Sequence, residues 1–152
     1  MIYTEETRDL FSVPEDYYFV QCISADFGMG KGIAVEFNKR FDTKMQLCTK
    51  CPNYWNAWKL YKMLGDCILE GRVYNLITKE RYFHKPTYIS MQIALEALRD
   101  KCRYFKTKKL AMPLIGCGLD RLDWQNVSEM IQNTFKNEDI EILVCKQYGV
   151  YL

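Results

Sequence analysis

Two glycine-rich turns, each lying between a strand-like run and a helical pattern, constrain the fold of this chain more than any other feature. The first turn spans residues 28–32 (GMGKG) and the second spans residues 116–118 (GCG). A glycine turn lets backbone N–H groups approach phosphate oxygens because no Cβ stands in the way, and a following helix N-terminus adds a favourable dipole. Glycine also occurs in many turns that bind nothing. It is the pair of turns that predicts a site for a diphosphate ligand.

Length and composition are those of an ordinary globular domain. The chain has 152 residues, of which 49% are hydrophobic and 26% are charged, and this suffices for one core without a metal or a disulfide. The sequence holds no linker or repeat, so we expect a single domain over residues 1–152. The formal net charge of +2 is too small to indicate nucleic-acid binding by itself.

The first residues of the chain and its cysteines indicate the cellular compartment in which the protein is found. Residues 1–9 are polar and acidic, whereas a signal peptide begins with basic residues and continues with an apolar run. No stretch approaches membrane-spanning length. The seven cysteines, an odd number, are expected to be reduced thiols. We therefore expect a cytoplasmic protein that does not contact membranes.

No metal or other cofactor is expected. Cys48 and Cys51 have C-x-x-C spacing, with Cys67 as a third potential ligand, but no second such pair completes a set of four. The chain has one histidine, His84, so a Ser/His/Asp triad would have to use it. We expect His84 to make a structural hydrogen bond.

The order of the expected elements predicts an α/β fold, with a mixed, mostly parallel sheet and helices on both faces. Apolar and β-branched runs predict strands over residues 17–24, 67–70, 72–78, 110–115 and 140–145, the last closing the sheet. Helical periodicity predicts helices over residues 33–41, in one or two pieces within 42–64, after a cap at Thr87 and after a cap at Asp123. The helix after Thr87 carries an apolar stripe that we expect to be core: Tyr88, Met91, Leu95, Leu98, Cys102 and Phe105.

Lys79 and Asp120 are the candidate catalytic residues. Each follows a predicted strand of the parallel part of the sheet, so both are expected at the same rim. A lysine beside a phosphate site can be a charge partner, or a nucleophile where its neighbours release the free amine. An aspartate nearby can act as an acid, a base or a hydroxyl acceptor. The alternative is that both are solvated loop residues.

The whole pattern resembles the macrodomains, specifically the terminal ADP-ribose glycohydrolase branch. The motifs that carry the resemblance are QCIS at 21–24, MGKGIA at 29–34, LITK at 76–79, HKPTY at 84–88 and PLIGCGLDRL at 113–122. The least similar segment is residues 42–66. The resemblance implies a three-layer αβα macrodomain that holds ADP-ribose across the top of the sheet.

The resemblance also implies roles for individual residues. Lys79 matches the family's catalytic lysine, which attacks the anomeric carbon of the distal ribose, and Asp120 matches the acidic residue that assists and then resolves the adduct. Asp9 would accept a hydrogen bond from the adenine amino group. Phe27 and Lys31, in the first loop, weaken the transfer of roles, because an aromatic ring there can stack on the distal ribose and a lysine can compete as a phosphate contact. Gly118 is expected to need a positive φ. The remaining ADP-ribose contacts would be Leu10, Ser24, Met29, Gly30, Gly32, Ile33, Thr78, Pro113, Ile115, Gly116, Cys117, Gly118 and Leu119.

These expectations favour an ADP-ribosyl hydrolase that removes terminal ADP-ribose from acidic protein side chains and deacylates O-acyl-ADP-ribose. A first alternative is an antitoxin-type glycohydrolase that removes ADP-ribose from a DNA base. A second is a module that reads ADP-ribose without turnover, which Lys79 and Asp120 together disfavour because a reader needs neither. We expect a monomer whose partners are ADP-ribose and an ADP-ribosylated protein or DNA.

Overall fold

Six strands form one mixed sheet in the computed structural model, which describes residues 1–147. The strands are β1 (Ile2–Thr7), β2 (Tyr18–Ser24), β3 (Asp66–Glu70), β4 (Val73–Lys79), β5 (Lys109–Met112) and β6 (Glu141–Lys146). They lie in the order β1-β6-β5-β2-β4-β3, and every neighbouring pair is parallel except β3 and β4. The predicted mixed, mostly parallel sheet is confirmed. The end of the expected domain, residues 148–152, lies outside the described residues.

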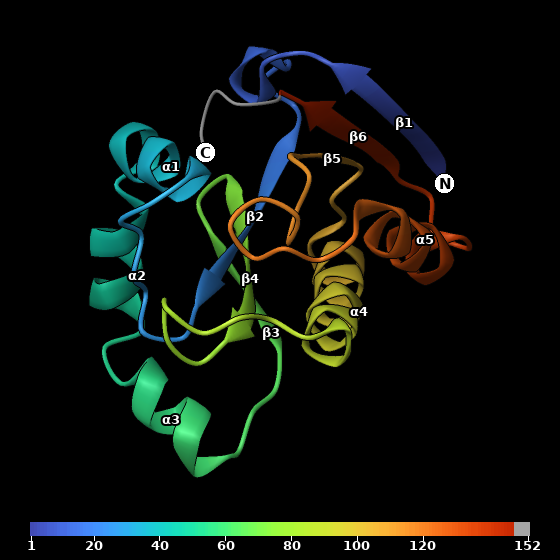
Figure 1. The fold of residues 1–152 in the computed structure, drawn as a ribbon. Helices are drawn as coiled ribbons and strands as arrows, with labels where there is room; N and C mark the ends of the chain where they lie inside the picture. Colours follow the sequence, from blue (N-terminus) through green and yellow to red (C-terminus); the bar gives the residue numbers. More distant parts are fainter. Residues whose placement is uncertain (148–152) are drawn as a thin grey trace.

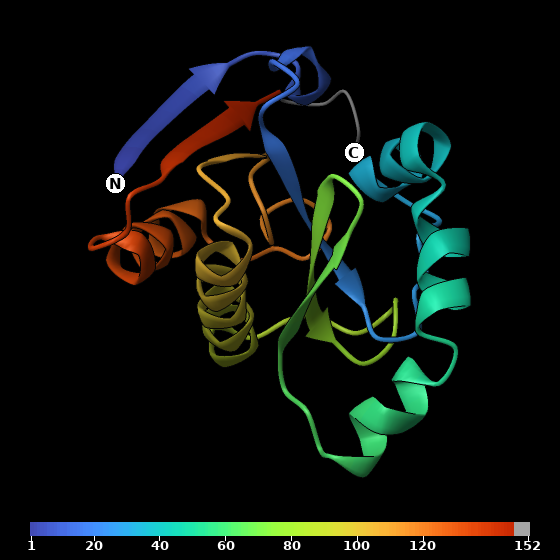
Figure 2. The ribbon, with the colours of Figure 1, turned by 180° about the vertical axis from the view of Figure 1, so that it is seen from behind.

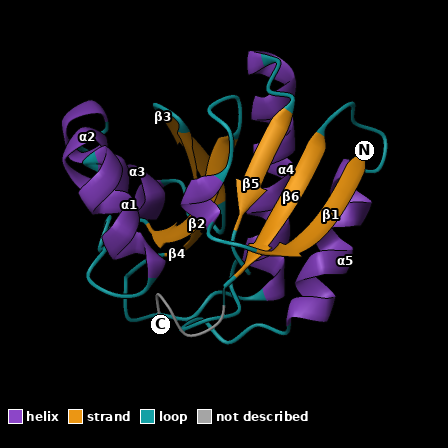
Figure 3. Ribbon diagram, turned by 90° about the horizontal axis from the view of Figure 1, so that it is seen from above, coloured by secondary structure: helices purple, strands orange, loops and turns teal. Residues whose placement is uncertain are grey.

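Helices cover both faces of the sheet (Figures 1 and 3). On one face lie α1 (Ile33–Phe41), α2 (Thr43–Lys50) and α3 (Tyr54–Leu60), and on the other lie α4 (Tyr88–Phe105) and α5 (Trp124–Phe135). A short 3-10 helix, η1 (Leu10–Ser12), follows β1. The three-layer αβα arrangement is therefore confirmed, and the segment predicted to hold one or two short helices holds α2 and α3.

A capping box and an apolar stripe fix α4 on the sheet. The Thr87 hydroxyl accepts the N–H of Ser90 and the Ser90 hydroxyl accepts the N–H of Thr87, each at 3.0 Å, which satisfies two N–H groups at the helix start. Tyr88 and Phe105, at the two ends of the stripe, are 40% and 50% exposed, so their assignment to the core was wrong. The buried members of the stripe are Met91, Leu95, Leu98 and Cys102.

The opposite face packs less continuously. Phe37 of α1 belongs to one apolar cluster, and Leu47 of α2 belongs to a second with Trp58 of α3. Between the two clusters, buried Gln21 donates through Nε2 to Oδ1 of buried Asn75 at 2.9 Å. A polar pair in the middle of this face thus joins β2 to β4.

Three strands differ from the prediction. β1 was missed, and it pairs with β6 at one edge of the sheet (Figure 2); β6 therefore does not close the sheet. β5 ends at Met112 rather than at Ile115, because Pro113 has no N–H to donate to a neighbouring strand. The strands predicted over residues 67–70 and 72–78 are confirmed as β3 and β4, which pair antiparallel on either side of Gly71.

The parallel strands bring several loops to one rim of the sheet. The carboxyl ends of β1, β2, β4 and β5 point the same way, so the segments that follow them, residues 8–12, 25–32, 80–87 and 113–123, lie at that end. The candidate site residues are at the ends of these strands or in these segments, except Ile33, which is the first residue of α1. Within residues 1–147, no helix is long and apolar enough to cross a membrane.

Candidate functional site

Lys79 and Asp120 form an ion pair at this rim. Lys79 is the last residue of β4, and Asp120 lies in the loop after β5. The Lys79 ammonium donates to Oδ1 of Asp120 at 2.6 Å, and the two side chains are only 13% and 14% exposed. A register shift sets Lys79 opposite Ser24, and such a bulge re-aims a side chain at a strand end. The structure thus brings together two residues that are far apart in the sequence.

The loop after β5 is closed at its base by a backbone hydrogen bond. The Leu122 N–H donates to the carbonyl oxygen of Gly116 at 2.7 Å. Gly116 has a φ of 74°, and a Cβ added there would come within 2.7 Å of Cε of Met91, so this position requires glycine. The prediction of a positive φ at Gly118 was wrong, because the left-handed glycine of this turn is Gly116.

Only the first glycine turn runs directly into a helix. Gly32, with a φ of 64°, is the N-cap of α1 and no side chain caps that helix, so its N-terminus is available to an anion. α5 begins later, at Trp124, where the Asp123 carboxylate accepts the N–H of Gln125 at 2.9 Å. Because a carboxylate already occupies the α5 N-terminus, the second turn does not share its dipole.

Asp26 organises the first turn, although it was not among the predicted site residues. Its carboxylate accepts the Ser24 hydroxyl and the backbone N–H groups of Gly28 and Tyr82, the last two at 3.1 and 3.2 Å. Burial acts to raise the pKa of Asp26, but these donors outweigh it and lower the pKa below its ordinary value. One signal could have found Asp26: an aspartate two residues before a glycine can accept that glycine's N–H.

Phe27 does not face a ligand. It has a φ of 59°, and its buried ring stacks on Tyr54 of α3 with the centroids 5.4 Å apart. The expectation that Phe27 stacks on a ribose was therefore wrong. Gly30 is exposed, and a Cβ there would meet nothing within 4 Å. Between Phe27 and the start of α1, the exposed positions of the turn are Gly30, which presents only backbone, and Lys31.

Several implied ADP-ribose contacts have buried side chains. Leu10, Met29 and Ile115 belong to the apolar clusters, so only their backbone atoms can reach a ligand. Thr78 is 1% exposed, and its hydroxyl has no hydrogen-bond partner within the described residues. A buried hydroxyl without a hydrogen-bond partner costs free energy. Thr78 directly precedes Lys79 in the sequence.

The other implied contacts fall into two groups. Ile33, Pro113 and Cys117 are partly buried, whereas Gly118 and Leu119 are exposed. Ile33 is the first residue of α1, and the other four lie in the segment after β5 that carries Asp120.

Asp9 lies after β1, toward the far end of the rim. One of its carboxylate oxygens accepts the N–H of Phe11 at 3.1 Å and so caps η1. Phe11 packs against Phe37 of α1, with the ring centroids 5.1 Å apart. In the strand order, three strands separate β1 from β4, so only an extended ligand could contact both Asp9 and Lys79.

Two thiols lie near the ion pair. Burial and the Asp120 carboxylate raise the pKa of Cys22, although Lys79 partly opposes this. Burial and the carboxylates of Asp123 and Asp120 raise the pKa of Cys117 to about 12. Both thiols are therefore protonated at neutral pH, and a protonated thiol is a poor nucleophile.

The cysteine and histidine positions give no metal centre. Among residues 1–147, no group of three or more His, Cys, Asp or Glu side chains is arranged to hold a metal ion. Cys48 is exposed, and burial and Glu70 raise the pKa of Cys51. Nδ1 of His84 accepts the N–H of Arg81 at 3.3 Å, which is the expected structural contact.

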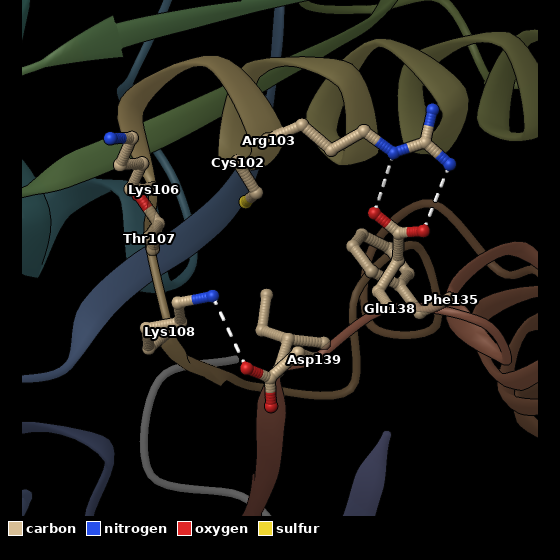
Figure 4. Close-up of a pocket in the computed structure, with 9 residues that line it drawn as sticks. Cys102, Arg103, Lys106, Thr107, Lys108, Phe135, Glu138 and Asp139 are labelled. Atoms are coloured by element: carbon tan, nitrogen blue, oxygen red, sulfur yellow. Dashed lines mark hydrogen bonds and ion pairs between the residues drawn. The ribbon is translucent and has the colours of Figure 1, made fainter.

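A small pocket lies away from this site, where α4 ends and β5 and β6 begin (Figure 4). Its volume is about 90 Å³, below the roughly 300–1,000 Å³ usual for small-molecule sites. Within it Arg103 forms two hydrogen bonds to Glu138, at 2.6 and 2.8 Å, and Lys108 pairs with Asp139 at 3.3 Å. The charges of these four side chains are therefore paired with one another, and the small volume of the pocket excludes it as the candidate site.

The Asp26 contacts predict a pH-dependent contribution to stability. Asp26→Asn should lower the free energy of unfolding at pH 7 by about 1–2 kcal/mol, since a charged acceptor is lost. Folding lowers the pKa of Asp26. The Asp26 carboxylate therefore stabilises the folded state above its unfolded-state pKa of about 3.9, and this contribution is lost as the pH falls through its folded-state pKa. Urea denaturation at pH 7 and pH 3 should show the difference shrinking at pH 3. Asp139→Asn, at a side chain that is 96% exposed, is the control. Equal stability of Asp26→Asn and wild type at pH 7 would contradict the assignment.

Comparisons with known proteins agree with this architecture. No model in a scan of protein-family models matches the chain. Over 137 residues the chain is 44% identical to the ADP-ribose glycohydrolase OARD1 of Homo sapiens, covering 90% of this chain and 86% of that protein.

Solved structures share the fold at low sequence identity. The macrodomain of Mycobacterium tuberculosis DarG matches with a TM-score of 0.78 and 21% identity, covering 97% of this chain and 99% of that one. Thermosipho africanus DarTG in complex with ADP-ribose matches with a TM-score of 0.68 and 16% identity, covering 100% of this chain and 43% of that one. By its identity to OARD1 and by its fold, the chain belongs to the macrodomain family of ADP-ribose glycohydrolases.

Proposed function

We propose that the protein is an ADP-ribosyl hydrolase that removes terminal ADP-ribose from acidic protein side chains and also deacylates O-acyl-ADP-ribose. The observation that carries the proposal is the largely buried pair of Lys79 and Asp120, with 2.6 Å between Nζ and Oδ1. The pair lies at the rim of the sheet that also carries both glycine turns. A relative at 44% identity is named an ADP-ribose glycohydrolase, which supports the same activity.

Lys79 acts as the nucleophile and Asp120 as the proton carrier. A proton passes from the Lys79 ammonium to Asp120, which leaves a neutral amine. The amine attacks the anomeric carbon of the distal ribose as the ester bond breaks, and the acceptor takes the Asp120 proton and leaves as a carboxylic acid. Water then attacks the same carbon, its proton goes to Asp120, and Lys79 leaves as an amine that recovers a proton from Asp120.

The two turns bind the diphosphate in this proposal. Backbone N–H groups at Gly30, Gly32 and the start of α1 face one phosphate, and Gly116 and Gly118 border the other. Asp9 accepts the adenine amino group through one of the several lone pairs of its carboxylate. A structural neighbour was solved in complex with ADP-ribose, which supports this ligand. The protein further acts as a cytoplasmic monomer, with residues 1–152 as one domain.

An acceptor panel tests the proposal. Peptides carrying Glu-linked or Ser-linked ADP-ribose and thymidine-linked ADP-ribose are incubated with the protein, and released ADP-ribose is measured by chromatography. We expect release from the Glu-linked peptide, because the Glu side chain leaves as a stable carboxylic acid once it has taken the Asp120 proton. Release from the thymidine-linked substrate alone would instead support a DNA-base glycohydrolase. Binding of ADP-ribose without release from any substrate would indicate a reader.

A further inference from the structure

The segment after Lys79 makes contacts that the proposed reaction has not used. Residues 84–88 (HKPTY) lead from the loop after β4 into the first residue of α4, Tyr88, and contact the loop that carries Asp120. His84 contacts its own turn and Thr87 caps α4. Lys85 and Tyr88 instead reach across to the other loop.

Lys85 contacts the tip of the Asp120 loop. Its ammonium donates to the carbonyl oxygen of Leu119 at 2.7 Å, and Leu119 directly precedes Asp120. A hydrogen bond from a charged donor is stronger than a neutral one. The peptide that carries Asp120 is therefore held from the side of β4, the strand that ends at Lys79.

Tyr88 contacts the far end of the same loop. Its hydroxyl accepts the N–H of Asp123 at 3.0 Å and Nδ2 of Asn126 at 3.2 Å. Together with the Leu122–Gly116 hydrogen bond at the base, these contacts fix the loop on both sides of Asp120.

The backbone beside Asp120 needs such support. Arg121 has a φ of 63°, in the left-handed region, although it is not glycine. Such a conformation costs about 1 kcal/mol or more and persists only where the surroundings hold it. Released from its neighbours, the loop would therefore tend to move Asp120 away from Lys79.

We propose that Lys85 and Tyr88 are positioning residues, which keep Asp120 within proton-transfer distance of Lys79. The inference rests on the proposed function, because it assigns these residues to the Asp120 step. Neither residue is required to touch ADP-ribose. Their loss should therefore slow turnover more than it weakens binding of the free ligand.

Two variants with matched controls test this. Lys85→Met keeps the length of the side chain without its ammonium, and Tyr88→Phe removes only the hydroxyl. On a peptide with Glu-linked ADP-ribose we expect kcat to fall about tenfold or more in each variant, because a misplaced Asp120 transfers protons more slowly. The Kd for ADP-ribose should stay within about threefold of the wild-type value. Lys44→Met, at an exposed lysine of α2, and Tyr104→Phe, at an 80% exposed tyrosine, should behave as wild type.

A conservative variant and an exchange measurement complete the test. Lys85→Arg should restore most of kcat, because a guanidinium can donate to the same carbonyl. Values of kcat within about twofold of the controls for both Lys85→Met and Tyr88→Phe would overturn the proposal. If wild type hydrolyses no substrate, the proposed function fails. Amide hydrogen exchange of residues 119–122 still tests whether Lys85 holds the Asp120 loop in place. Faster exchange in Lys85→Met than in Lys44→Met supports the contact, and equal exchange overturns it.

Discussion

Lys79→Ala is expected to abolish hydrolysis while leaving ADP-ribose binding largely intact. We expect the rate on the Glu-linked peptide to fall roughly 10³-fold or more, because the nucleophile is lost. The Kd for ADP-ribose should stay within about threefold, since the two turns and Asp9 provide most of the recognition. Rates are measured by released ADP-ribose and affinity by calorimetry.

The control for this variant is a lysine in a comparable fold position but away from the site. Lys146→Ala removes an amine at the end of β6 that pairs with Glu5 at 3.5 Å, and it should keep the wild-type rate. Loss of ADP-ribose binding together with turnover in Lys79→Ala would mean that the lysine is a ligand contact rather than a nucleophile.

Asp120→Ala is expected to differ from the lysine variant by trapping an intermediate. Without Asp120 the Lys79 ammonium must lose its proton to solvent before it can capture the ribose, and the residue that activates water is also gone, so the overall rate should fall roughly 10²–10⁴-fold. Covalent protein–ADP-ribose should then accumulate, and intact mass spectrometry would detect it. Digestion should place the modification on Lys79.

Two comparisons make the trapping result specific. Asp139→Ala, at a side chain that is 96% exposed, should show neither slowing nor adduct. The double variant Lys79→Ala with Asp120→Ala should show no adduct. An adduct in the double variant would place the attachment elsewhere and contradict the assigned nucleophile.

Local patterns in the sequence predict much of the fold. The apolar run that forms β2 and the periodic face that forms α1 depend on neighbouring residues alone, and the structure gives these elements as Tyr18–Ser24 and Ile33–Phe41. β1 was missed because its sequence, IYTEET, is mostly polar and exposed. It is a strand because β6, from the other end of the chain, pairs with it.

The candidate site also has features that the sequence predicts and features that it does not. That Lys79 and Asp120 share a rim follows from strand order, which a sequence pattern can predict. The Asp26 and Lys85 contacts could not be predicted in that way, because each joins loops from different strands. Burial of the Phe27 ring under α3 was likewise unpredictable, since it depends on how residues 42–64 fold back over the first turn.

Lys79→Arg tests the covalent mechanism most directly. Arginine keeps the positive charge beside Asp120 but is protonated at any ordinary pH and cannot attack the ribose. The measurement compares the release of ADP-ribose from the Glu-linked peptide by wild type and by Lys79→Arg. Calorimetry first establishes that the two proteins bind free ADP-ribose with equal affinity. The account predicts release by wild type and none above background by the variant. Turnover by Lys79→Arg at the wild-type rate would reduce Lys79 to a charge partner and contradict the covalent mechanism.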